Sequence, residues 1–117
     1  MITRFNNYIV ESRKSIDDLE ILTSDELGEL LIFEVTMNYP DAKYIQDLIT
    51  CGCPVDYRGE FGRTALHYVA MYGFIKIVQL LISNGADITA GDNNDQTAWD
   101  YANNEIRNMF PELKPNK

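Results

Sequence analysis

The stretch that decides the fold of this chain reads Gly62-Arg63-Thr64-Ala65-Leu66-His67-Tyr68-Val69-Ala70. Its apolar run ends at Gly73, and glycine suits the left-handed residue that closes a helix. Apolar residues then recur at helical spacing over residues 75–82, and Asn84-Gly85 ends this second helical pattern. Residues 87–95 hold no apolar run and are rich in Asp, Asn and Gly, which is typical of a loop. The pattern therefore predicts a helix, a tight turn, a second helix and a long polar loop.

This pattern is repeated along the chain. A shift by 33 residues places similar residues on one another, without a gap, from about residue 39 to residue 101. The matching pairs are Tyr39 and Tyr72, Lys43 and Lys76, Gln46 and Gln79, Leu48 and Leu81, Ile49 and Ile82, Gly52 and Gly85, Val55 and Ile88, Thr64 and Thr97, Ala65 and Ala98, and Tyr68 and Tyr101. The sequence therefore predicts a stack of similar helix pairs.

The stretch from Gly62 to Ala70, followed by Gly73 and Gly85-Ala86-Asp87, resembles an ankyrin repeat. The pattern of that family is Thr-Pro-Leu-His-x-Ala, and Ala65 stands here in place of the proline. The resemblance implies an all-α fold in which helix-turn-helix units stack side by side. It also implies that the His67 ring bonds the threonine of its own motif and the backbone of the neighbouring repeat.

The register divides the chain into about two and a half repeats with a segment at either end. Residues 59–91 form the full repeat, whereas residues 26–58 resemble a degenerate first repeat that lacks the Thr and the His. Residues 92–110 resemble a shortened last repeat that serves as a C-terminal cap. We expect residues 1–25 to form an N-terminal helical cap and residues 111–117 to form a tail.

The terminal parts of a repeat stack need surfaces that the central part does not. Apolar residues at helical spacing within residues 3–22 favour a helix that covers the open side of the first repeat. A homodimer interface formed by the same segment is the alternative. Glu34 and Asp100 occupy the position of His67 in the first and last repeats. We expect both carboxylates to lie on polar outer faces.

The charge of the chain bears on its partners and location. Ten Lys and Arg stand against eighteen Asp and Glu, so the formal net charge is −8. Such a chain repels phosphate groups, and we expect no direct binding of nucleic acid or of an anionic membrane. The chain shows neither a membrane-spanning apolar run of roughly 18 residues nor the apolar core of a signal peptide at its start. Cys51 and Cys53 are too close for an unstrained disulfide, which favours free thiols in a reducing cytoplasm.

Residue types that carry chemistry are scarce. His67 is the only histidine, and neither a phosphate-binding Gly-x-x-x-x-Gly-Lys motif nor a Gly-x-Ser-x-Gly motif is present. Asp92, Asn94 and Gln96 alternate like the first ligands of a calcium loop, but the twelfth position holds Asn103 and the sixth holds no glycine. We expect no enzymatic activity, no cofactor and no metal.

The expected function is the binding of another protein. The resemblance implies a concave contact face built from the loop tips and the first helix of each repeat. Carried onto this chain, the candidate partner-binding residues are Tyr39, Tyr57, Arg58, Glu60, Phe61, Arg63, Met71, Tyr72, Asn93, Asn94, Gln96 and Asn104. Aromatic residues, Met and Arg are enriched at interface hot spots. Tyr39 and Tyr72 share one repeat position near the end of a first helix, so we expect them to share one role, either partner contact or packing between repeats.

An alternative function rests on residues 11–34, which hold eight acidic residues against Arg13 and Lys14. An acidic surface of this kind attracts basic partners and could mimic nucleic acid. The chain would then be a phage or viral inhibitor of a host nucleic-acid-binding or defence protein, and it would act in the host-cell cytoplasm. Affinity based on charge falls steeply with ionic strength, whereas affinity based on an aromatic face does not.

Overall fold

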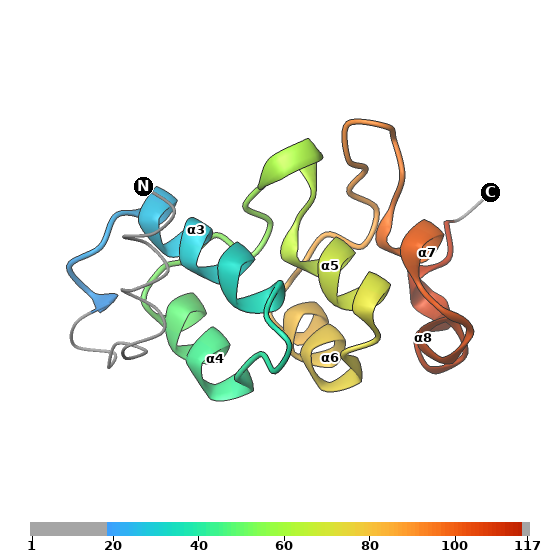
Figure 1. Cartoon of the computed structure of the whole chain (residues 1–117), viewed down its shortest axis with the longest axis horizontal. Helices are drawn as coiled ribbons and strands as arrows, with labels where there is room; N and C mark the ends of the chain where they lie inside the picture. The colour runs from blue at the N-terminus through green and yellow to red at the C-terminus, as the bar shows by residue number, and fades with distance from the viewer. Residues whose placement is uncertain (1–18, 116–117) are drawn as a thin grey trace.

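The computed structural model describes residues 19–115. Most of the expected N-terminal cap lies outside the described residues, as do Asn116 and Lys117. The described part forms two layers of helices (Figure 1). One layer holds α3 (Ser24–Val35), α5 (Ala65–Tyr72) and α7 (Ala98–Tyr101), and the other holds α4 (Ala42–Thr50), α6 (Ile75–Ser83) and α8 (Asn104–Met109). Two short 3-10 helices, η1 (Glu60–Gly62) and η2 (Pro111–Leu113), complete the elements.

The spacing of the helices confirms the predicted repeat period. Helices α4 and α6 begin one period apart, at Ala42 and Ile75, and they are equal in length. Helices α5 and α7 also begin one period apart, at Ala65 and Ala98. The all-α stack is therefore confirmed, and the residues that the structure describes contain no strand.

The first helix of the first repeat departs from the predicted register. Helix α3 begins at Ser24, so it crosses the expected boundary between residues 25 and 26, and it ends at Val35. Its start is set by a capping box, in which the Thr23 amide donates to Glu26 Oε1 over 2.9 Å and the Glu26 amide donates to Thr23 Oγ1 over 3.1 Å. Tyr39 consequently lies in the connection between α3 and α4. The prediction that it ends a first helix, as Tyr72 does, is wrong.

Threonine also caps the other two helices of this layer. The Thr64 amide donates to His67 Nδ1 over 3.0 Å, and the Thr97 amide donates to Asp100 Oδ2 over 2.8 Å. Asp100 is exposed, as expected, and takes the place of the histidine in the last repeat. The expectation for Glu34 is wrong. Its side chain is completely buried, and its Oε2 accepts a 2.7 Å hydrogen bond from the amide of Asp41, the residue that caps α4.

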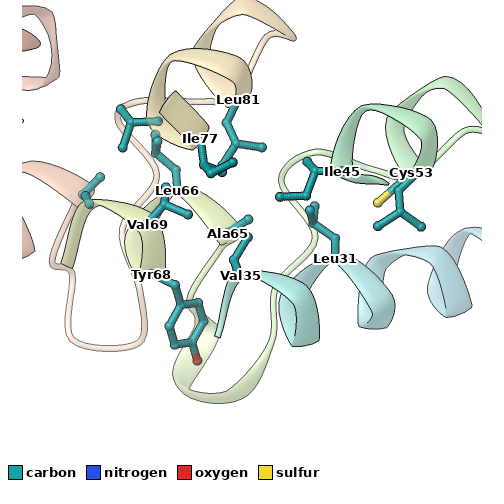
Figure 2. Close-up of a cluster of buried hydrophobic side chains, with 14 of the residues drawn as sticks. Leu31, Val35, Ile45, Cys53, Ala65, Leu66, Tyr68, Val69, Ile77 and Leu81 are labelled. Carbon is teal, nitrogen blue, oxygen red and sulfur yellow. The ribbon is translucent and has the colours of Figure 1, made fainter. Parts of the chain in front are cut away.

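One continuous apolar core joins the repeats. Figure 2 shows side chains of α3 and α4, such as Leu31, Val35 and Ile45, beside side chains of α5 and α6. Leu19, the first described residue of the expected cap, and Leu113, within the expected tail, are also buried in this core. Both ends of the described chain thus add apolar surface to the stack, which stabilises a small protein. None of the helices among residues 19–115 is long and apolar enough to span a bilayer.

Candidate partner-binding face

Two loops extend beyond the helix layers on the same side of the molecule, one between α4 and α5 and the other between α6 and α7 (Figure 1). Backbone and side-chain hydrogen bonds tie them together. The Asn93 amide donates to the Phe61 carbonyl over 2.9 Å. Arg58 Nη1 donates to the carbonyl of Gly62 in its own loop over 2.8 Å and to the carbonyl of Gly91 in the next loop over 2.6 Å. These hydrogen bonds join the tips of the two loops into one surface, which we call the loop edge.

Phe61 stands at the tip of the first of these loops. Its φ is 63°, a left-handed conformation that is uncommon for a residue other than glycine, and 61% of its surface is exposed. A Cβ on the following Gly62 would collide with the side chain of Asn93, so the close approach of the two loops requires glycine there. The structure thus holds a large aromatic ring in solvent on a constrained backbone.

The candidate residues differ in how far they reach solvent. Tyr39, Arg58, Glu60, Phe61, Tyr72, Asn93, Asn94, Gln96 and Asn104 are exposed, whereas Tyr57, Arg63 and Met71 are half-buried. Tyr39 is 88% exposed, but Tyr72 is 49% exposed and stacks on Tyr68 with ring centroids 6.3 Å apart. The two tyrosines therefore do not share one environment, because α3 ends before the position that the register predicts.

Arg63 is held by the protein's own residues. Its guanidinium carbon lies 5.1 Å from the ring centroids of Phe61 and Tyr101 and 5.9 Å from that of Tyr68. Its Nε lies 3.7 Å from the carboxylate of Asp92, and its side chain is only 24% exposed. Arg63 therefore supports the face from beneath and offers little of its charge to a partner.

Asp92 is a buried carboxylate that shapes the second loop. Its Oδ1 accepts hydrogen bonds from the amides of Asn94 and Gln96, over 2.9 and 3.0 Å, and its Oδ2 accepts one from the Tyr101 hydroxyl. Burial raises the pKa of Asp92, but the hydrogen bonds from Tyr101, Gln96 and Asn94 outweigh it, and the pKa is about 2. The Asp92, Asn94 and Gln96 alternation thus forms a loop closed on its own carboxylate. No group of three or more His, Cys, Asp or Glu within residues 19–115 could hold a metal ion.

His67 joins the same loop to α5. Its Nδ1 accepts the Thr64 amide and lies 2.9 Å from Thr64 Oγ1, while its Nε2 donates to the Gln96 carbonyl over 2.9 Å. These partners require the neutral ring with its proton on Nε2. Burial lowers the pKa of His67 and favours that neutral form. The expected bonds to the threonine of its own motif and to the backbone of the next repeat are confirmed.

Beside this edge lies an open groove that the sequence did not predict. One wall is α3 together with its C-cap residue Thr36, and α3 contributes Glu29, Ile32 and Phe33 at the spacing of a single helical face. The other wall is residues 57–60, and Tyr68 of α5 completes the lining. The volume of the groove is about 620 Å³. Of the twelve candidate residues, this groove brings together Tyr57, Arg58 and Glu60.

Tyr57 forms part of the groove because of a glycine. Gly28 on α3 has no room for a Cβ, since the Tyr57 ring occupies that position. Burial and the charges of Glu29 and Asp25 raise the pKa of Tyr57. Glu29 and Asp25 both belong to α3, so their charges add to the effect of burial and make this side of α3 electrically negative. Sequence reasoning included Glu29 only in the acidic stretch of residues 11–34 and missed Phe33. Both could be recognised as neighbours of Tyr57 only once the bounds of α3 were known.

Two comparisons with known proteins bear on this architecture. The model of a family described as ankyrin repeats in three copies matches residues 32–114. A curated ankyrin repeat protein of Acanthamoeba polyphaga mimivirus is 30% identical to this chain over 91 residues. That match covers 74% of this chain but only 12% of the relative, so the chain spans a small part of the relative's length.

Proposed function

Because this chain belongs to the ankyrin repeat family, whose members generally act as protein–protein interaction modules, we propose that it binds a partner protein through the loop edge and the α3, α5 and α7 layer. The observation that carries this proposal is the exposed Phe61 ring on its constrained, hydrogen-bonded loop. No catalytic step and no cofactor form part of the proposed function.

The energetics of the face support binding. Phe61 and Tyr72 together expose two large rings on one side of the stack, and burying such rings against a partner releases water from apolar surface. The Arg58 and Asn93 hydrogen bonds already order the loop tips, so association loses little further conformational entropy there. A pre-organised aromatic edge of this kind suits a rigid interface.

The test is the paired substitution Phe61→Ala and Tyr72→Ala. We expect the double variant to capture less of a partner from lysate than the unmodified protein, while its thermal midpoint stays within about 4–8 °C, the shift expected for about 1 kcal/mol in a domain of this size. The measurement is an affinity pull-down with mass spectrometry, accompanied by a thermal melt. Met109→Ala is the matched control, since Met109 is 54% exposed on α8 of the other layer.

Two results would count against the proposed face. If the double variant unfolds, Phe61 and Tyr72 belong to the core. If Met109→Ala lowers capture as much as the double variant does, general hydrophobicity and not this face causes the binding.

The acidic-inhibitor alternative makes a different prediction for the same experiment. Asp25, Glu26 and Glu29 are exposed on α3, whereas Glu34 is buried and contributes nothing to an acidic surface. A partner released by a modest rise in salt would favour charge mimicry of nucleic acid and a viral or phage role in a host cell. A partner retained at high salt would favour the aromatic face.

Self-association and location complete the proposal. We propose that the protein acts in the cytoplasm, which is that of a host cell if the chain is viral, and that it contacts neither nucleic acid nor membrane directly.

A homodimer through residues 3–22 would show as a concentration-dependent mass in light scattering. A constant monomer mass across the range that binds the partner would contradict it.

A further inference from the structure

We propose that the groove between α3 and residues 57–60 receives an arginine side chain from the partner protein. This inference rests on the proposed function and specifies which side chain of the partner this part of the face accepts. Three features favour this occupant, namely the aromatic lining of the groove, the carboxylates at its rim and the environments of the protein's own arginines.

The lining of the groove is aromatic. Phe33, Tyr57 and Tyr68 contribute rings from three different segments, namely α3, the loop and α5. Tyr68 is directed away from Ile77 and Leu81 in the core, with its hydroxyl at the outer end (Figure 2). Aromatic walls accept the long apolar stem of an arginine, and their faces attract its planar guanidinium.

The rim of the groove is acidic. Glu29 on α3 and Glu60 on the loop are both exposed and line opposite walls. Within residues 19–115, no Lys or Arg forms an ion pair with either carboxylate. Arg58, the cation of the lining, directs Nη1 to the carbonyls of Gly62 and Gly91. Neither carboxylate is therefore paired with a cation of the described residues, in a chain whose net charge is already −8.

The same protein shows how such a side chain would lie. Arg63 stacks over Phe61 and Tyr101 and faces the carboxylate of Asp92, and Arg107 lies 4.9 Å from the ring centroid of Trp99. Aromatic rings and carboxylates are also combined in the lining of the groove, where Glu29 and Glu60 are the carboxylates and the cation Arg58 is directed to the loop carbonyls. Lysine, which is more strongly hydrated and not planar, fits this combination less well.

The experiment uses four pools of immobilised heptapeptides whose central residue is arginine, citrulline, lysine or glutamate, with mixed uncharged residues at the other positions. The full chain, fluorescently labelled at its N-terminus, is applied to each pool, and its half-saturating concentration is measured. We expect the arginine pool to bind about tenfold more tightly than the citrulline pool, which has nearly the same shape without the charge, with lysine in between and glutamate weakest. Equal binding to the arginine and citrulline pools would overturn the proposal.

A pair of variants separates the groove from the general charge of the surface. Glu29→Gln with Glu60→Gln removes two charges at the rim, and Glu105→Gln with Glu112→Gln removes two exposed charges on α8 and η2. We expect only the first variant to lose the preference for arginine over citrulline. An equal loss in both variants would assign the preference to net charge and would overturn the groove as its cause.

Failure of this inference and failure of the proposed function are distinguishable. If the pools show no arginine preference but Phe61→Ala with Tyr72→Ala still lowers partner capture, the binding face stands and the groove has another role. If partner capture is unaffected while the pools discriminate, the groove binds arginine independently of the aromatic edge.

Discussion

His67 illustrates how a single side chain acts at the residue scale. It is buried between its own helix cap and the next loop, with both ring nitrogens bonded. Protonation would place a second N–H on Nδ1, facing the Thr64 amide that donates to it, so the charged ring cannot keep this arrangement. Asp92 lies in the same region with its charge preserved by donors. One titratable group is thus kept neutral and the other ionised, each by the hydrogen bonds that its position supplies.

The stability of the protein should therefore fall as the pH drops below the ordinary pKa of histidine. The pKa of His67 is lowered in the folded state, so between that value and about 6.5 the unfolded chain binds the extra proton. The stabilising contribution is complete above pH 6.5 and is lost as the pH falls through this window. Urea unfolding at pH 7.5, 6.5 and 5.5 measures it. A His67→Gln variant should lose this pH dependence, and a slope that persists in the variant would assign it to other groups.

At the scale of the element, three threonines set where the helices of one layer begin. Thr23, Thr64 and Thr97 each start a capping box, in which the threonine and the residue at the third helical position exchange hydrogen bonds between side chain and backbone. The partner differs in each case, being Glu26, His67 and Asp100. Glu26 and Asp100 each use a carboxylate oxygen to accept the amide of their threonine. Histidine serves in the middle repeat, where its second nitrogen reaches the next loop.

Removal of one such partner should weaken α7, the shortest α-helix among residues 19–115. Helix α7 has four residues, and Asp100 accepts the Thr97 amide at its start. We expect Asp100→Ala to lower the free energy of unfolding by about 1 kcal/mol, the usual cost of losing a cap. Chemical denaturation followed by circular dichroism measures this. Glu112→Ala, an exposed carboxylate outside the caps, should change stability by less than about 0.5 kcal/mol. Equal effects of the two substitutions would show that the Asp100 cap does not stabilise α7.

At the scale of the whole molecule, the repeats are joined both through the core and across the loops. The core is continuous from Leu19 to Leu113. Across the loops, Arg58 donates to the Gly91 carbonyl and the Asn93 amide donates to the Phe61 carbonyl. The Asp92 carboxylate accepts a hydrogen bond from the Tyr101 hydroxyl of α7. In a repeat stack each unit contacts only its neighbours, so the stability of the last repeat depends on this joint. The same joint orders the proposed binding edge.

Asp92→Ala should therefore loosen the last repeat more than the first. The substitution leaves the amides of Asn94 and Gln96 and the Tyr101 hydroxyl without their acceptor, at a cost of roughly 1–3 kcal/mol for each group that stays buried. We expect amide hydrogen exchange to accelerate in α7 and α8 while α4 keeps its protection. Asn94→Ala, an exposed side chain in the same loop, is the control and should leave both patterns unchanged. Uniform acceleration along the chain would show that the joint serves global stability only.

Features that depend on neighbours along the chain could be predicted from the sequence. The repeat period, the equal spans of α4 and α6, and the left-handed glycine after α5 all follow from local signals. Burial could not be predicted in the same way. Glu34 stands at the position of a histidine and was expected on the outside. It is instead buried, and the Asp41 amide at the start of α4 donates a hydrogen bond to its carboxylate. The candidate contact residues remain a prediction that binding experiments must test.

The sequence by itself determined the family, the all-α repeat architecture and the two helices of the full repeat, because helical periodicity and helix-end signals are properties of short segments. Only the tertiary structure decided which side chains meet. The groove joins Glu29, Tyr57 and Tyr68, which are far apart in the chain, and the early end of the first helix places Tyr39 in solvent while Tyr72 stacks on a neighbour. Such juxtapositions arise from the packing of one repeat on the next, and burial and electrostatic environment are set by that packing and not by the order of residues.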